Sequence, residues 1–146
     1  MKKFTFSLDS LLNLRELEEQ NAKAALAREN AFVEQITMRI QELESLVEGA
    51  YGSWDGQAGR KFNSMDRMGL SAQIADLQKT AGEARSALAA AKTKRAKAMK
   101  SLQDATRNRK VVTNLKEKRF KEYTAEVLKQ EANEIEDVFN ARRSAR

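Results

Sequence analysis

Apolar residues recur at alternating steps of four and three along two long stretches of the chain. Eleven of the fourteen such positions from Leu8 to Trp54 are apolar, as are eleven of the thirteen from Leu70 to Val112. A heptad pattern sustained over so many repeats is typical of a coiled coil rather than of a helix in an ordinary globular domain. The phase of the pattern changes after Val112, which indicates that the helix pairing ends or changes there.

A glycine-rich window separates the two stretches. Five of the six glycines lie between Gly49 and Gly69, and the 146 residues include no proline. An interior proline costs a helix about 3 kcal/mol, so the absence of proline favours two uninterrupted helices. We expect one coiled-coil domain over residues 1–146, with a helix over about 7–54, a Gly-rich loop over about 55–65 and a second helix over about 66–142.

The two stretches can be folded onto each other in one register. In an antiparallel pair the numbers of facing residues add to a constant, and a sum of 124 matches every position of one seam with a position of the other. Leu43, for example, faces Ala81, and a layer of one large and one small residue favours close packing. We therefore predict an all-α fold, an antiparallel two-helix coiled-coil hairpin with a longer C-terminal helix. The predicted seam includes Leu12, Leu26, Val33, Ile36, Ile40, Val47, Ile74, Leu88, Leu102 and Val112.

Charged residues test this register. Glu29 faces Arg95, which favours it. Arg15 faces Arg109, which is unfavourable, so either both side chains turn outward or the coil is loosened at this layer. Residues 1–54 carry a net charge of −3, residues 55–111 of +8 and residues 112–146 of +1, which add to the total of +6. A basic second helix beside an acidic first helix disfavours a parallel pairing of identical chains.

The two helices are unequal in length. In the register of 124, Phe4 reaches Phe120, and about 25 residues beyond Lys121 have no partner within the chain. An unpaired helix with apolar positions indicates a docking surface. The apolar residues in this overhang are Tyr123, Val127, Leu128, Ile135, Val138 and Phe139.

Several classes of chemistry are excluded by the residue types present. The chain has no histidine and no cysteine, so it lacks Ser-His and Cys-His nucleophile pairs and thiolate or imidazole metal ligands. The segment GQAGRKF at 56–62 lacks the phosphate-binding GxxxxGK[ST] spacing, and we interpret it as a flexible turn. Glu131 and Glu134 could imitate a metal-binding helix, but the His three residues after a Glu that di-iron bundles require is absent, so we interpret the pair as a solvated face. We expect no enzymatic activity, no cofactor, no metal and no small-molecule substrate.

The chain also lacks signals for a membrane or for secretion. No stretch approaches the roughly 18 apolar residues of a membrane span. The N-terminal MKKFTFSLDS has two lysines but no apolar signal-peptide core. We expect a soluble, cytoplasmic protein.

Two further features have both a structural and a functional interpretation. Residues 85–110 form a basic run with few acids, which is either a solvated helix face, a surface for an acidic protein or a surface for nucleic acid. No aromatic residues interleave with these bases for stacking, which counts against nucleic acid. Trp54 and Tyr51, with Phe62 nearby, either cap the coil over Leu70 or anchor an interface.

Both ends of the chain resemble a known family. The N-terminal pattern F-x-F-x-L-x-x-L-L-x-x-R-x-x-x-E runs from Phe4 to Glu19, and the C-terminal half has R-x-R-K at 107–110, LKEKRFKEY at 115–123 and E-x-x-x-I-E-D at 131–137. Together with a helix, a Gly-rich gap and a longer helix, these segments resemble the flagellar export protein FliJ family and the related stalk proteins of type III secretion.

The resemblance implies a non-enzymatic antiparallel coiled coil that looks like the central stalk of rotary ATPases. Such proteins bind the hexameric flagellar export ATPase, link it to the cytoplasmic domain of the membrane export gate and escort empty export chaperones, at the inner membrane. By that analogy the ATPase-facing residues are Phe4, Phe6, Arg107, Arg109, Lys110, Lys118 and Tyr123. The gate-facing residues are Leu43, Leu46, Tyr51 and Leu77.

Two other functions compete with this interpretation. The basic run also fits a helical hairpin that binds nucleic acid, for which steep salt dependence is the signature. The overhang also fits a generic structural coiled coil that associates with itself.

Overall fold

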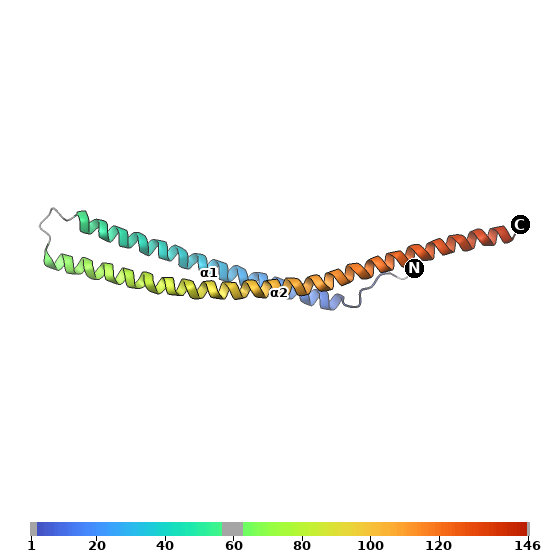
Figure 1. The fold of residues 1–146 in the computed structure, drawn as a ribbon, viewed down its shortest axis with the longest axis horizontal. Helices are drawn as coiled ribbons and strands as arrows, with labels where there is room; N and C mark the ends of the chain where they lie inside the picture. The colour runs from blue at the N-terminus through green and yellow to red at the C-terminus, as the bar shows by residue number, and fades with distance from the viewer. Residues whose placement is uncertain (1–2, 57–62, 146) are drawn as a thin grey trace. The chain divides into compact units, whose positions relative to one another are not determined.

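The computed structural model describes residues 3–56 and 63–145. It contains two helices, α1 from Asp9 to Gly56 and α2 from Ser64 to Ser144, and no strand within those ranges (Figure 1). The predicted all-α helical hairpin with a longer C-terminal helix is thereby confirmed. The helix ends lie two residues from the predicted bounds of 7–54 and 66–142.

Local sequence explains where the helices begin and how their ends are stabilised. Asn63 precedes α2, and its side-chain Oδ1 accepts a hydrogen bond from the Met65 N–H at 3.5 Å, as expected of an N-cap asparagine. Asp9 lies in the first turn of α1, where a negative charge is favoured by the helix dipole. Arg142 and Arg143 lie in the last turn of α2, where positive charge is favoured.

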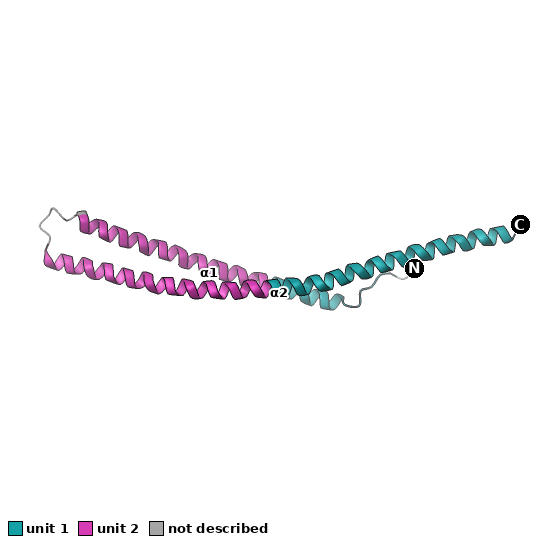
Figure 2. Ribbon diagram, viewed as in Figure 1, with its two compact units in different colours: residues 1–21, 103–146 teal, residues 22–102 magenta. Residues whose placement is uncertain are grey.

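The chain divides into two compact units (Figure 2). Unit 1 consists of residues 1–21 and 103–146, and unit 2 consists of residues 22–102. Each unit contains part of α1 and part of α2, so each has its own section of the hairpin seam.

Unit 2 contains the central and tip-side part of the seam. Val33 and Ala91, which face each other in the register of 124, are both buried, at 7% and 0% exposure. Leu43 and Ala81 are each 2% exposed. The remaining seam residues predicted within this unit are buried or half-buried: Leu26, Ile36, Ile40, Val47, Ile74, Leu88 and Leu102. Their burial supports the predicted phase of the seam in both helices.

Contacts between the helices of unit 2 run in the antiparallel sense. Gln78 donates to the Tyr51 hydroxyl at 3.1 Å, and Arg85 forms an ion pair with Glu44 at 3.1 Å. As the residue number rises from 78 to 85 on α2, the partner number falls from 51 to 44 on α1. This reversal is what a hairpin with constant register requires.

Unit 1 has a core formed by Phe6, Leu12 and Val112. Leu12 and Val112 form a predicted layer, and both are buried, at 7% and 6% exposure. Phe6 comes from the segment before α1, which is not helical from residue 3 to residue 8. The partly buried residues packed against this core are Phe4, Leu11 and Leu115.

The unpaired part of α2 begins later than the sequence predicts. The Phe4 ring lies 5.2 Å from that of Phe120, as expected, but it also lies 5.4 Å from the ring of Tyr123. Tyr123 and Val127 are half-buried, and every described residue from Leu128 to Ala145 is exposed. The prediction of an overhang immediately after Lys121 was therefore wrong by about two helical turns. The segment before α1 is not helical, so each of its residues can span more than the 1.5 Å rise of a helix.

Candidate partner-binding surfaces

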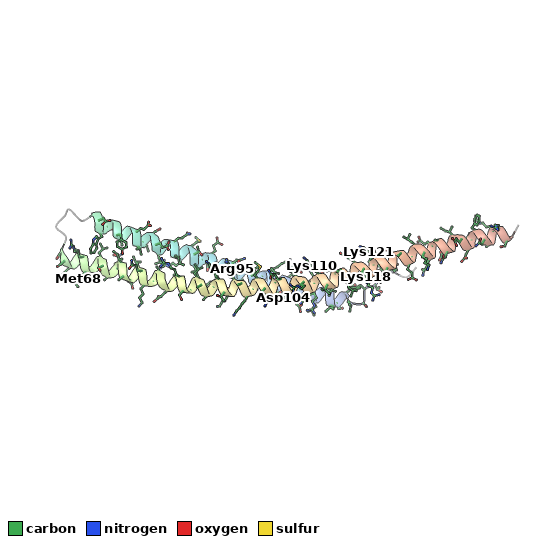
Figure 3. All side chains as sticks on the ribbon, viewed as in Figure 1. Met68, Arg95, Asp104, Lys110, Lys118 and Lys121 are labelled. Atoms are coloured by element: carbon green, nitrogen blue, oxygen red, sulfur yellow. The ribbon has the colours of Figure 1, made fainter. Side chains whose placement is uncertain are left out.

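The predicted ATPase-facing residues of unit 1 divide into surface and core positions. Arg107, Lys110 and Lys118 on α2 are exposed, and Figure 3 marks Lys110 and Lys118 along this helix. Phe6 is 8% exposed and belongs to the core of the unit. Arg109 is half-buried. The three exposed cations can meet another protein without a change in the fold, and Phe4 and Tyr123 are half-buried.

Arg109 is held by an ion pair across the seam. Its Nε donates to the Glu19 carboxylate, and a guanidinium nitrogen lies 3.5 Å from the Thr113 hydroxyl. Glu19 is the buried acid of this unit, at 6% exposure. Since a buried charge is costly unless it is paired, this contact fixes the Arg109 side chain against α1.

The unfavourable layer of Arg15 and Arg109 is thus relieved within unit 1. Arg15 pairs with Glu18 on its own helix at 2.9 Å, while Arg109 pairs with Glu19 on the opposite helix. Sequence analysis missed the role of Glu19. The signal was present, because Glu19 is a seam position that faces the small residue Ala105 in the register of 124.

An aromatic cluster marks the end of the packed part of unit 1. Phe4 contacts Phe120 edge-on, at 75° between the rings, and contacts Tyr123 at 46°. A groove runs between the N-terminal segment and α2, and its lining includes Phe4, Arg119, Tyr123 and Glu126. Nearby in the chain, Lys116 pairs with Asp9 at 2.7 Å, and its ammonium lies 5.8 Å from the centroid of the Phe6 ring. The cluster therefore presents aromatic edges and charged groups on one surface.

The predicted gate-facing residues of unit 2 also differ in accessibility. Leu43 is 2% exposed and Leu77 is half-buried, so both side chains contribute to the hairpin seam. Leu46 and Tyr51 are exposed, at 52% and 47%. A groove of the same unit is lined by residues that include Val47, Glu48, Gln78 and Ala81.

At the tip of unit 2, Trp54 is 37% exposed. The Arg67 guanidinium lies over the Trp54 ring, 6.0 Å from the ring centroid. Leu70, which Trp54 would cap in one of the two interpretations of the sequence, is half-buried. Phe62 and most of the segment 56–62 lie outside the described residues.

The basic run is mostly a solvent-facing surface. Lys92, Lys94, Lys97 and Lys100 are exposed, whereas Arg95 is half-buried at its seam position. Glu29, the predicted partner of Arg95, is also half-buried. Within the described ranges no ion pair joins the two side chains, and Arg95 instead lines a groove with Val33, Thr37 and other α1 residues.

The described residues offer little for other kinds of site. No group of three or more His, Cys, Asp or Glu side chains in residues 3–56 and 63–145 is placed to hold a metal ion. Glu131 and Glu134 are exposed. None of the helices, over the part that was described, is long and apolar enough to cross a membrane.

These features define a class: an all-α coiled-coil hairpin whose candidate sites are surfaces for other macromolecules. A family model described as the flagellar FliJ protein matches residues 4–146. The chain belongs to the FliJ family and is a component of the flagellar export apparatus, a type III secretion system. No curated protein and no solved structure matches the chain.

Proposed function

We propose that this protein is a non-enzymatic coiled-coil adaptor that binds the hexameric flagellar export ATPase and couples it to the export gate. It would act in the cytoplasm, peripheral to the export machinery at the inner membrane, and would also escort export chaperones. The observation that carries the proposal is the family match over residues 4–146. The absence of histidine and cysteine from the sequence supports a role without catalysis.

The ATPase-binding surface is proposed at unit 1. Arg107, Lys110 and Lys118 are exposed there, on the same helix as the exposed C-terminal residues. Exposed cations favour an acidic partner surface and speed its association. Phe4 and Tyr123 would add aromatic contact area, and aromatic side chains are common at the centre of interfaces. Phe6 and Arg109 would position this surface from within the unit, because their side chains are committed to the core and to Glu19.

The gate-binding surface is proposed at unit 2. Leu46 and Tyr51 are exposed on α1 and would contact the partner directly. Leu43 and Leu77 lie at seam positions of the same unit, and they would hold the helices at the spacing that presents Leu46 and Tyr51.

Binding of the purified full-length chain to the export ATPase tests the first surface. We expect the triple variant Arg107→Glu, Lys110→Glu, Lys118→Glu to bind at least about tenfold more weakly in calorimetry, a loss of about 1.4 kcal/mol. The matched control is Lys92→Glu, Lys97→Glu, Lys100→Glu, which reverses three exposed cations of unit 2. No binding by the unaltered chain, or an equal loss in both variants, would refute the proposed surface.

Binding to the cytoplasmic domain of the gate tests the second surface. Leu46→Asp with Tyr51→Ala should abolish binding, while Met38→Asp, at another exposed apolar position of α1, should preserve it. If the chain binds neither protein but shifts duplex DNA or RNA with steep salt dependence, the nucleic-acid alternative replaces this proposal.

A further inference from the structure

The C-terminal end of α2 has an apolar face with nothing packed on it. We define the tail as residues 128–145, which are all exposed. Leu128 is 65% exposed, Ile135 70%, Val138 54% and Phe139 64%. These are large fractions for residues that helices normally bury against another element. A helix of this kind lowers its free energy by covering the apolar face.

The residues along this face follow a heptad order. Steps of three and four from Leu128 lead through Glu131, Ile135, Val138 and Arg142 to Ala145. The order is therefore apolar, acidic, apolar, apolar, basic and small. Heptad spacing predicts that the face packs against another helix in a coiled coil.

The order of residue types along this face is complementary to the same order in a second tail that runs in the opposite direction. If two tails pair antiparallel with facing numbers that add to 273, Ile135 faces Val138 of the second copy, at the centre. Glu131 then faces Arg142, and Leu128 faces the small residue Ala145. Each layer occurs twice because the pair has a two-fold axis. The six layers thus contain two apolar centres, two opposite-charge pairs and two large–small pairs.

The distribution of charge also selects the antiparallel arrangement. Residues 131–137 contain four acids and no base, and residues 142–143 are two arginines. A parallel pair would place acid beside acid and base beside base. An antiparallel pair with facing numbers that add to 273 instead places Glu131 beside Arg142 in two layers, and like-charge contact is a recognised barrier to wrong pairing.

We propose that two copies of this protein associate through their tails as an antiparallel two-helix coiled coil. The tail spans eighteen residues, about 27 Å of helix, so the interface is small and the dimer is weak. The tail need not nucleate a helix on its own, because it continues the long α2. Its pairing requires no change in the seam of either unit.

Sedimentation velocity of the full-length chain, from about 10 μM to about 1 mM, tests the association. We expect a concentration-dependent monomer–dimer equilibrium. Glu131→Arg and Arg142→Glu should each weaken the dimer at least about tenfold, because each places like charges in two layers. The double variant Glu131→Arg, Arg142→Glu should restore it, since the layers regain opposite charges in exchanged order.

The control is Glu136→Arg, which makes the same change of charge at an exposed position outside the seam. It should leave the dimer constant within about twofold. A chain that stays monomeric throughout the range, equal effects of Glu131→Arg and Glu136→Arg, or no rescue by the double variant would each overturn the proposal.

Disulfide trapping tests the direction, because the chain contains no cysteine of its own. A mixture of Ile135→Cys and Val138→Cys chains should form the mixed disulfide faster than either homodimer. Faster cross-linking of Ile135→Cys with itself would show a parallel pair and contradict the inference. Circular dichroism of each variant, at a concentration where the chain is monomeric, should show unchanged helicity.

Discussion

The guanidinium of Arg109 on α2 donates to the carboxylate of Glu19 on α1, across the seam of unit 1. The two side chains differ in burial, at 28% exposure for Arg109 and 8% for Glu19. The Arg109 side chain is long enough to turn its charge toward water, whereas Glu19 lies at a seam position that faces Ala105. The free-energy cost of breaking this ion pair therefore comes mainly from the buried carboxylate of Glu19.

This asymmetry gives the first prediction. Arg109→Leu should lower the free energy of unfolding by about 1–3 kcal/mol, because it removes the cross-seam ion pair made by the buried Glu19 carboxylate. Glu19→Leu should cost less, since it places an apolar group in the seam and lets Arg109 reach solvent. Thermal unfolding followed by circular dichroism measures both. A larger loss for Glu19→Leu would contradict this assignment of cost.

Two neighbouring leucines of α1 provide the second prediction. Leu43 is 2% exposed and Leu46 is 52% exposed. Leu43→Ala should destabilise unit 2 by about 2–5 kcal/mol, since it removes buried methyl groups and leaves a cavity. Leu46→Ala, the matched control, should change stability by less than about 0.5 kcal/mol. Equal shifts of the melting temperature in the two variants would show that the phase of the seam is wrong.

The third prediction concerns a fully buried alanine in the seam of unit 2. Ala91 is 0% exposed and faces the buried Val33 in the register of 124, so a larger side chain there would have to be accommodated inside the seam. Ala91→Leu should cost about 1–3 kcal/mol through overpacking. Ala90→Leu makes the same substitution at an exposed position and should be nearly neutral. Chemical denaturation of both chains provides the comparison, and an unchanged midpoint for Ala91→Leu would be the contrary result.

The fourth prediction concerns where packing ends on α2. A chain that ends after Val127 should keep its melting temperature, because every described residue beyond that point is exposed. A chain that ends after Lys121 also loses Tyr123, which contacts Phe4. It should melt at a lower temperature, since an aromatic pair contributes about 0.5–1.5 kcal/mol beyond its burial.

Hydrogen exchange of residues 4–12 provides a local measure for the same pair of truncations. Faster exchange in the shorter chain and unchanged exchange in the longer one would locate the boundary between Lys121 and Leu128. Equal exchange in both would move the boundary back to the earlier, sequence-based position.

The seam could be predicted from the sequence because each helix repeats its own local pattern. The heptad steps correctly identify Leu12, Val33, Leu43 and Ala91 as buried, and the register of 124 pairs Leu12 with Val112. The candidate surfaces were harder to predict. A resemblance to a family does not distinguish Leu43 from Leu46, because burial depends on the face of the helix that meets its partner.

Helicity, the position of the break and the antiparallel register follow from the sequence by itself, since they depend on apolar spacing and on the placement of glycine and proline. Tertiary structure decided how Arg109 is paired and how far Phe4 reaches along α2. Long charged side chains can choose among several partners within reach, and a non-helical segment does not keep the rise of a helix. Those two outcomes therefore depend on the three-dimensional arrangement of atoms that lie about 90 or more residues apart in the chain.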